Sequence, residues 1–353
     1  MGKARIFAFY LPQFYPTKEN DQWWEEGFTE WTNVKRAKPL FKGHEQPRVP
    51  GELGYYDLRN PKVRERQAEM ARKAGIEGFC YWHYWFAGRQ LLDKVFKEVT
   101  ESGNPNFPFC LCWANHDWYK KTWDPSKPDA LLIEQTYPGE EDYINHFKAM
   151  LPAFTDSRYI KVEGKLLFGI YAPLDIPDFN FLKCLWNRLA QEYGLEGFYF
   201  FGFTFDSKEI RPILESGYNS VVIDHIFTTV YGRKPLSKLV VKTYRKLTGS
   251  FPVQDYRKYS RTVLAGDYSE FVHPCILPNF DHSPRSGDKG IIIVNHSPER
   301  WRILCANLFK KLKNRKNNLL FIKAWNEWGE GNYLEPDQKN GDGFLTALSK
   351  VLY

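Results

Sequence analysis

The chain has 353 residues, of which 43% are hydrophobic and 17% aromatic, and its formal net charge is +7. This composition excludes a disordered chain, and the length suits one large core of the size that (β/α) barrels build. The modest positive charge does not indicate nucleic acid, so we expect no nucleic-acid partner. The sequence also has no apolar run near the roughly 20 residues that span a bilayer.

Short apolar segments alternate with amphipathic segments along the chain. Eight segments are predicted as strands, at 5–10, 78–82, 109–113, 166–171, 198–203, 220–224, 274–278 and 319–324. Helices are predicted at 61–74, 91–102, 141–154, 181–193, 299–313 and 343–352. Eight such units predict an α/β fold with a parallel sheet closed into a (β/α)8 TIM-type barrel. We expect residues 1–353 to form a single catalytic barrel domain with long Trp-rich loops at its C-terminal face.

Most tryptophans follow the predicted strands, in the segments where (β/α) barrels carry their active sites. Ten of the 12 fall there: Trp23, Trp24, Trp31, Trp82, Trp85, Trp113, Trp118, Trp123, Trp325 and Trp328. Flat aromatic faces can cover the apolar side of a pyranose ring. Polar residues are interleaved with them, which favours a sugar-binding cleft. The alternative is that the aromatic rings form a small core within the large loops.

The segment after the last predicted strand reads Trp325-Asn326-Glu327-Trp328-Gly329-Glu330-Gly331. A carboxyl group near an aromatic wall can keep its proton, while a second one in a more polar setting stays ionised. Glycosidic bonds are broken by such carboxyl pairs. An arbitrary Glu-x-x-Glu would be an exposed pair, but here two tryptophans flank it and two glycines permit tight turns. The sequence therefore predicts Glu327 and Glu330 as the catalytic residues.

The chain resembles the WbsX family, which is found in bacterial polysaccharide-synthesis loci and is often labelled glycosyltransferase. The blocks that carry this resemblance are Phe9–Phe14, Asn20–Trp24, Gly27–Val34, Gly54–Arg59, Gly78–Phe86, Cys110–Asn115, Ala324–Gly331 and Leu334–Asp337. More distantly, the chain is similar to the endo-α-mannosidases of glycoside hydrolase family 99. That second resemblance depends mainly on the Asn-Glu-Trp-x-Glu-Gly block.

The resemblance to the mannosidases implies a barrel enzyme that retains anomeric configuration without an enzyme nucleophile. In such enzymes one Glu deprotonates the substrate's own 2-hydroxyl, which forms a 1,2-anhydro sugar, and the other protonates the leaving oxygen and later activates water. Carried over by motif, Glu327 assists the 2-hydroxyl and Glu330 is the general acid/base. The chain departs from their motif at Gly329, where the mannosidases usually have His.

Further residues are predicted to bind the substrate around this pair. They are Tyr10, Glu30, Trp31, Trp82, His83, Trp85, Trp113, Asn115, Trp118, Asp281, Arg285, Asn326 and Trp328. Asp281 and Arg285 lie in a block similar to a Trp-Asp-Asn-x-x-Arg motif of the same family, and a structural ion pair is the alternative for them. No His-x-His or His-x-x-x-His spacing indicates a metal site, so we expect neither a metal nor a cofactor.

The segment 232–261 is strongly basic, with nine Lys and Arg residues and Asp255 as its one acid. A basic amphipathic helix can lie on an anionic membrane, so peripheral membrane contact is one interpretation. The alternative is an ordinary barrel helix with a solvated face. The six scattered cysteines and an N-terminus without signal-peptide character predict a cytoplasmic location, with membrane-peripheral placement as a variant.

Three function classes compete on these observations. The first is a retaining glycosidase that acts on a bacterial polysaccharide or a lipid-linked oligosaccharide. The second is a glycosyltransferase or transglycosylase in O-antigen or capsular polysaccharide biosynthesis, although we find no Asp-x-Asp motif and no Gly-rich loop after a strand. The third is a non-catalytic carbohydrate-binding protein, which would keep the tryptophans but would not need both carboxyl groups.

Overall fold

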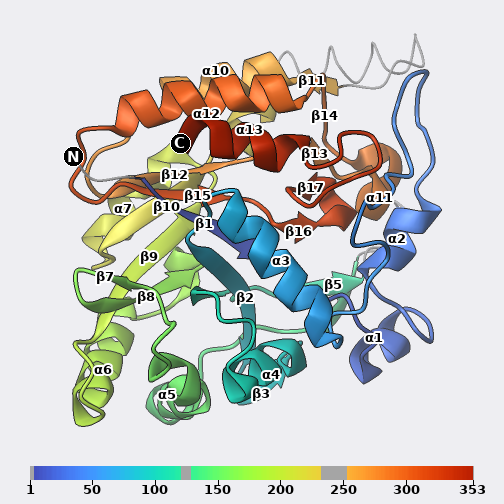
Figure 1. Cartoon of the computed structure of the whole chain (residues 1–353). Coiled ribbons are helices and arrows are strands. Elements are labelled where there is room, and N and C mark those ends of the chain that lie inside the picture. The colour runs from blue at the N-terminus through green and yellow to red at the C-terminus, as the bar shows by residue number, and fades with distance from the viewer. Residues whose placement is uncertain (1–3, 121–128, 232–252, 353) are drawn as a thin grey trace.

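The structure is a computed structural model that describes residues 4–120, 129–231 and 253–352. Within this part, eight parallel strands form one closed barrel (Figure 1). In spatial order they are β1 (Arg5–Tyr10), β15 (Leu319–Ile322), β12 (Val272–Ile276), β10 (Ser220–Asp224), β9 (Phe198–Thr204), β8 (Lys165–Ile170), β4 (Phe109–Trp113) and β2 (Gly78–Phe86). The barrel closes because β1 pairs with both β15 and β2. The predicted (β/α)8 TIM-type fold is confirmed.

Helices surround this barrel, as Figure 1 shows. They are α3 (Pro61–Lys73), α4 (Lys94–Ser102), α5 (Glu140–Phe154), α6 (Phe179–Glu192), α7 (Ile210–Glu215), α8 (Ile226–Tyr231), α10 (Tyr256–Ala265), α12 (Pro298–Leu312) and α13 (Gly343–Leu352). Their ends follow local signals. The side chain of Asn60 accepts a hydrogen bond from the backbone of Lys62 at the start of α3, and Pro61 occupies its first turn. Gly75 follows α3 with a left-handed φ of 85°, which ends the helix.

Smaller elements extend the loops above the barrel. After β1 come α1 (Lys18–Trp23) and α2 (Glu30–Arg36), and after β4 a hairpin of β5 (Trp118–Lys120) and β6 (Ala130–Ile133). The short strands β11 (Val253–Asp255), β14 (Ile292–Val294) and β13 (Phe280–Asp281) form a small sheet next to α11 (Ser283–Ser286). After β15, β16 (Asn326–Glu327) pairs with β17 (Asn332–Tyr333) around a 3-10 turn at Trp328–Glu330. The two-residue strand β7 (Lys161–Val162) precedes β8.

Some predicted element boundaries need correction. The segment 274–278 was expected as a strand, but β12 ends at Ile276, because the backbone N–H of Leu277 donates to the Tyr259 hydroxyl rather than to a neighbouring strand. Strand β2 continues past residue 82 to Phe86, where it pairs with β3 (Arg89–Leu91). That extra strand pair delays the following helix, which begins at Lys94 instead of 91.

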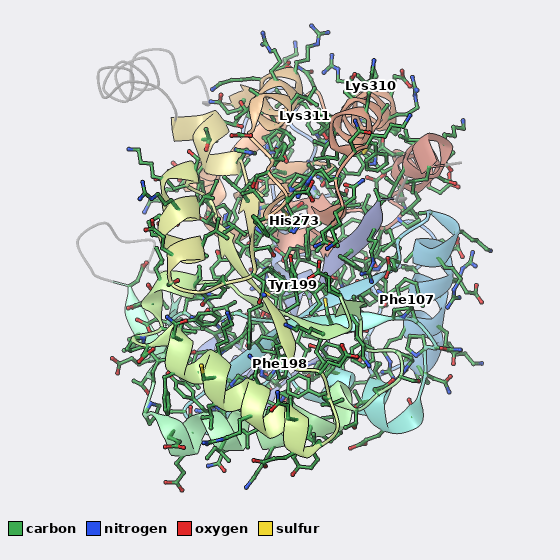
Figure 2. The ribbon with its side chains drawn as sticks, turned by 90° about the vertical axis from the view of Figure 1, so that its left-hand side faces the viewer. Phe107, Phe198, Tyr199, His273, Lys310 and Lys311 are labelled. Atoms are coloured by element: carbon green, nitrogen blue, oxygen red, sulfur yellow. The ribbon has the colours of Figure 1, made fainter. Side chains whose placement is uncertain are left out.

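Aromatic side chains fill the barrel. Phe321 of β15 lies 4.9 Å from Phe201 of β9 and 5.7 Å from Phe9 of β1, between ring centroids. Because β9 and β15 are not neighbours in the sheet, these rings meet across the barrel interior. Figure 2 shows the packed interior from the side, with Tyr199 and His273 among the strands. Both are buried, whereas Lys310 and Lys311 at the end of α12 are exposed.

Residues 232–252 of the basic segment 232–261 lie outside the described residues. In the remaining part, α10 buries Tyr256 and Tyr259 against the barrel and exposes Arg257 and Arg261. This part therefore fits the alternative of an ordinary barrel helix. Among the described residues, no helix combines the length and the apolar character needed to cross a bilayer.

The barrel interior should be the main source of stability. We expect Phe321→Ala to lower the free energy of unfolding by about 3–5 kcal/mol, because it leaves a cavity between fully buried rings. Chemical denaturation followed by tryptophan fluorescence measures this loss. The control is Phe271→Ala, since Phe271 is 56% exposed, and we expect a change within about 0.5 kcal/mol. Equal losses in both variants would contradict this account of the core.

Candidate active site

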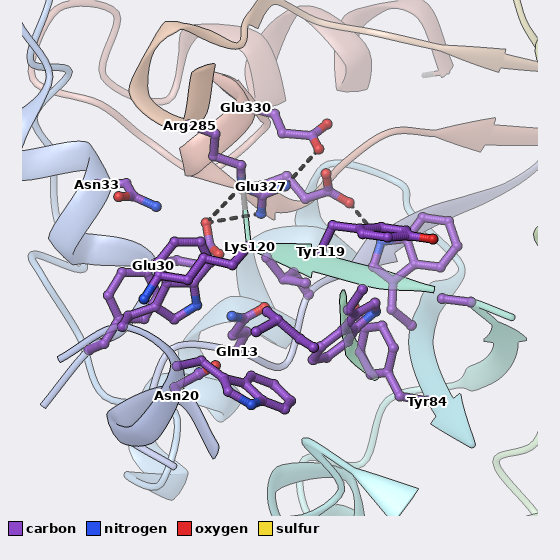
Figure 3. A pocket seen from close by; sticks show the side chains of 18 of the residues that line it. Gln13, Asn20, Glu30, Asn33, Tyr84, Tyr119, Lys120, Arg285, Glu327 and Glu330 are labelled. Atoms are coloured by element: carbon purple, nitrogen blue, oxygen red, sulfur yellow. Dashed lines mark hydrogen bonds and ion pairs between the residues drawn. The ribbon is translucent and has the colours of Figure 1, made fainter. Parts of the chain in front are cut away.

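A cavity of about 630 Å³ opens where the barrel strands end, below the loops that carry α1, α2 and the β5–β6 hairpin. Figure 3 shows it from close by. Aromatic rings form much of its wall, including Trp23, Trp24, Trp82, Tyr84, Trp118 and Tyr119. Both predicted catalytic carboxyl groups, those of Glu327 and Glu330, line the same cavity. The site is therefore at the C-terminal face of the barrel, where catalytic groups of this fold gather.

Asn326 fixes the segment that carries the two glutamates. The backbone N–H of Leu11 donates to its side-chain oxygen over 2.8 Å, and its side-chain nitrogen donates back to the Leu11 carbonyl over 3.0 Å. These two bonds tie the loop after β15 to the loop after β1. Gly331 then closes the turn with a φ of 51°, a left-handed conformation that glycine adopts without strain. The backbone thus turns Glu327 and Glu330 into one cavity.

The carboxyl group of Glu327 favours its protonated form. The Trp82 indole N–H donates to Glu327 Oε1 over 2.6 Å, and the side chain is almost fully buried. Burial and the negative charge of Glu330 together raise the pKa of Glu327 to about 8. At neutral pH this side chain therefore carries a proton.

The carboxyl group of Glu330 favours its ionised form. Burial alone would raise its pKa, but the charges of Lys323 and Arg285 outweigh that and hold the pKa of Glu330 well below its usual range. Arg285 Nη1 lies 2.7 Å from Oε1, and Lys323 Nζ lies 3.2 Å from Oε2. His282 adds a third nitrogen 3.7 Å from Oε1. One proton therefore serves the pair, and Glu327 favours holding it in the free site.

Arg285 bridges two carboxylates in the cavity wall (Figure 3). Besides Glu330 it binds Glu30 of α2, with Nη2 at 2.9 Å and Nε at 3.1 Å from Glu30 Oε2. This bridge needs the absence of a side chain at Gly329, since a Cβ there would lie 2.3 Å from Glu30 Oε2 and 2.8 Å from Arg285 Nε. Gly329 thus makes room for the ion pairs that keep Glu330 charged.

Comparison with known proteins places this chain in a family. The family model described as "Glycosyltransferase WbsX" matches residues 6–348. The chain belongs to the WbsX family. Two relatives, both called uncharacterized protein WxcX and both from strains of Xanthomonas campestris pv. campestris, are 34% identical over 357 residues. The alignment covers 99% of this chain and 50% of each relative, so the chain spans about half the length of the curated relatives it matches.

Solved structures share the fold at low sequence identity. One is named glycoside hydrolase-like protein; the superposition covers 100% of this WbsX-family chain and 94% of that protein, with 14% identity and a TM-score of 0.60. The GH99 endo-alpha-mannosidase from Bacteroides thetaiotaomicron covers 99% of this chain and 96% of its own, with 14% identity and a TM-score of 0.51. These likenesses show that the chain shares its barrel fold with these proteins.

Four of the residues predicted to bind substrate line the cavity of this WbsX-family chain: Glu30, Trp82, Trp118 and Arg285. The other nine do not, and the direct contact expected for them needs correction. They are Tyr10, Trp31, His83, Trp85, Trp113, Asn115, Asp281, Asn326 and Trp328. Each is buried among protein partners instead, so it supports the site from behind.

Strand parity explains four of these corrections. Side chains alternate across a strand, so Trp82 and Tyr84 face the cavity while His83 and Trp85 face α5. His83 Nε2 lies 2.7 Å from His146 Nε2 of α5, and Trp85 Nε1 donates to Asp142 over 3.1 Å. The Trp113 indole N–H donates to the Trp85 carbonyl. Tyr10 follows inward-facing Phe9, so its hydroxyl instead donates to Gln67 of α3.

The remaining corrected residues are fastened by hydrogen bonds within the loops. Asp281 accepts from Gln46 over 2.7 Å and lies 2.8 Å from His44 Nε2, so it anchors the loop before α3. Asn115 bonds the backbone of Ala172 in both directions. The Trp31 indole N–H donates to the Tyr56 carbonyl.

Glu335 fastens the catalytic turn from behind and was not singled out from the sequence. Its carboxyl accepts from the Trp328 indole over 2.6 Å, the Gln67 amide over 2.6 Å and the Tyr56 hydroxyl over 2.8 Å. Burial raises the pKa of Glu335 to about 7. The sequence signal was available, because Glu335 lies in a block shared with the WbsX family.

Lys323 is a further residue of the cavity that sequence reasoning missed. It lies directly after β15 and lines the cavity beside Glu330. Its position two residues after inward-facing Phe321 was the signal that could have identified it. Among the described residues, no group of three or more His, Cys, Asp and Glu side chains is arranged to hold a metal ion.

The space at Gly329 gives a direct test of the charge bridge. We expect Gly329→Ala to push Arg285 away from Glu30 and Glu330, because the new methyl group would overlap Arg285 and Glu30. The pKa of Glu330 should then rise towards its usual value, as a carboxyl NMR titration would measure. Glu30→Gln, which weakens the ion pair without adding volume, should leave Arg285 on Glu330. A crystal structure of Gly329→Ala with Arg285 in its original place would contradict this explanation.

Proposed function

We propose that this chain is a retaining glycoside hydrolase-like enzyme that acts on a bacterial polysaccharide or a lipid-linked oligosaccharide. The observation that carries the proposal is the Glu327–Glu330 pair at an aromatic-walled cavity, where Glu327 favours its protonated form and Glu330, bound to Arg285 and Lys323, its ionised form. A carboxyl pair with one proton contains both a proton donor and a proton acceptor, which is what cleavage of a glycosidic bond needs. A protein that only binds sugar would gain nothing from burying such a pair.

The cavity suits neutral sugars. Its wall combines tryptophan and tyrosine faces with a few hydrogen-bonding groups, and its volume of about 630 Å³ lies in the range of small-ligand sites. The cations nearest the glutamates are already matched by acids, since Lys323 and Arg285 bind Glu330 and Arg285 also binds Glu30. Recognition of a strongly anionic substrate would have to break these pairs.

The proposed reaction follows the route implied by the family 99 resemblance. Glu327 takes the proton of the substrate's 2-hydroxyl, O2 then attacks C1, and Glu330 gives a proton to the departing oxygen. A 1,2-anhydro sugar results, and water activated by Glu330 opens it with overall retention. Each proton gained by one carboxyl is matched by a proton lost from the other.

In this route the shared proton must cross from Glu327 to Glu330 when the substrate binds. Hydrogen bonding explains why it would. A 2-hydroxyl that donates to Glu327 stabilises the ionised form of that carboxyl, while a glycosidic oxygen next to Glu330 accepts a hydrogen bond only from its acid form. Substrate binding would therefore reverse the proton distribution of the free site.

Glycosyl transfer is the second candidate, favoured by the description of the family as a glycosyltransferase. The same carboxyl pair could pass the sugar to a hydroxyl group of another sugar rather than to water. The two outcomes differ only in the acceptor. Product analysis by mass spectrometry, with and without an added oligosaccharide acceptor, separates hydrolysis from transfer.

Substitution of the two glutamates tests their roles. Glu327→Gln and Glu330→Gln should each keep the fold and lose roughly 10²–10⁴-fold in rate. A substrate with a good leaving group should partly restore Glu330→Gln, because such a group barely needs a proton donor. It should not restore Glu327→Gln, which lacks the base for the 2-hydroxyl. Steady-state kinetics with aryl glycosides measure this. Brisk cleavage of a 2-deoxy substrate, or a sugar trapped covalently on either glutamate, would overturn the proposed route.

The pH profile tests the need for a single shared proton. Since the pKa of Glu327 is raised to about 8, the pair loses its only proton above that pH, and kcat/KM of the free enzyme should fall there. At acid pH Glu330 is also protonated, so the pair then holds two protons and activity should fall again. Rates measured across the pH range with an oligosaccharide substrate give both limbs. Full activity far into the alkaline range would contradict a role for the shared proton.

A further inference from the structure

Lys323 is buried directly beside the catalytic pair. Its backbone N–H donates to the Ile276 carbonyl over 3.0 Å, which fixes the residue at the end of the barrel. Its Nζ donates to Glu330 Oε2 over 3.2 Å, and the side chain is only 8% exposed. The rings of Phe205 and Phe280 lie 5.7 and 6.0 Å from the ammonium. An ammonium in such apolar surroundings needs close negative charges to stay ionised.

A second acid, Asp224, is buried near the same ammonium; burial raises the pKa of its carboxyl to about 6, and the charge of Lys323 opposes that rise. Asp224 ends β10 and has no exposed surface. Its Oδ1 accepts from the backbone N–H of Ile226 over 2.9 Å, while its Oδ2 has no hydrogen-bond partner among the described residues. The negative charges of Glu330 and Asp224 both stabilise the protonated form of Lys323, which raises its pKa despite burial. The Lys323 ammonium therefore interacts electrostatically with Glu330, a member of the proposed catalytic pair, and with Asp224, which lies outside that pair.

We propose that Lys323 is a further active-site residue, which determines whether Glu327 or Glu330 carries the shared proton, and that Asp224 is its second counter-ion. In the free site Lys323 stabilises ionised Glu330 and so keeps the proton on Glu327. When the proton crosses to Glu330, that carboxyl becomes neutral and Lys323 loses one counter-charge. Asp224 then retains the lysine charge inside the protein. The step only moves one proton between two carboxyl oxygens, so charge and atoms balance.

Other ionisable groups also face the pair, and they do not change between the variants used to test this proposal. They are Arg285 and His282 from the α11 segment, Glu30 from α2, Tyr84 from β2, His116 from the loop after β4 and Tyr171 from the loop after β8. Asp224 is in turn near Cys275, Tyr259 and Tyr268. Lys323 and Asp224 can therefore be changed one at a time against a constant background.

The first experiment measures protonation without any substrate. Carboxyl carbons of Glu and Asp are labelled with ¹³C and titrated by NMR, and signals are assigned by their loss in Glu327→Gln and Glu330→Gln. We expect Lys323→Met to raise the proton affinity of Glu330 at least tenfold, because it removes a cation. Asp224→Asn should lower that affinity, by less, because it removes a negative charge. Lys323→Arg is the matched control and should keep the original distribution.

Opposite shifts are the decisive result, since general loosening of the site would move both variants in the same direction. Unchanged titration of Glu330 in both variants, or shifts of the same sign, would overturn the proposal. Thermal unfolding checks that each variant is folded. If Lys323→Met does not fold, Asp224→Asn and Lys323→Arg still give a predicted lowering and a predicted lack of change.

A second experiment links Lys323 to turnover, and this part rests on the proposed function. With a cleaved substrate, Lys323→Met should lower kcat more than it changes KM and should move the acid limb of the pH profile to higher pH. Lys323→Arg should restore most of kcat. If no glycosidic bond is cleaved by the wild type, the proposed function fails while the titration result stands. If cleavage occurs but the acid limb does not move, Lys323 has no part in the proton distribution.

Discussion

The unequal neutralisation of two buried carboxyl groups is the constraint on which the site depends. Glu327 and Glu330 are three residues apart and line one cavity, yet only Glu330 has an ammonium and a guanidinium in contact. Two adjacent carboxylates cannot both stay ionised in an apolar cavity, because their repulsion adds to the desolvation of each charge. The cations therefore decide that one proton remains and which carboxyl group holds it.

Much of the surrounding structure serves to place those cations. Arg285 reaches Glu330 from α11, and α11 follows Asp281, which is fastened to His44 and Gln46. The missing side chain at Gly329 leaves room for the arginine to bridge Glu30 and Glu330. A mannosidase-type His at this position would occupy that space. The glycine that departs from the mannosidase motif is thus the same residue that makes the ion-pair bridge possible.

The fold could be predicted because each barrel strand is an apolar run of its own and each helix carries local end signals such as Pro61 and Gly75. The placement of Glu327 and Glu330 in one cavity could be predicted because they follow the last strand in one short block. Which tryptophans face the cavity was harder. Trp82 and Trp85 both lie in β2, and only the alternation of side chains along that strand separates Trp82, which reaches Glu327, from Trp85, which binds Asp142. Because the strand was predicted to end at residue 82, this alternation was not applied to residues 83–86.

Long-range ion pairs lay beyond sequence reasoning, and they explain why the free site differs from the roles carried over by resemblance. Glu30, Arg285 and Glu330 come from three separate segments, so no spacing along the chain connects them. Asp224 comes from a fourth segment, whereas Lys323 shares the segment after β15 with Glu330. The resemblance assigns the proton donor to Glu330, whereas Lys323 and Arg285 favour the ionised form of that residue. Both statements hold together if the substrate moves the proton. The cations then make the free site stable with Glu330 charged, and the sugar's own hydroxyl and glycosidic oxygen provide the hydrogen bonds that reverse it.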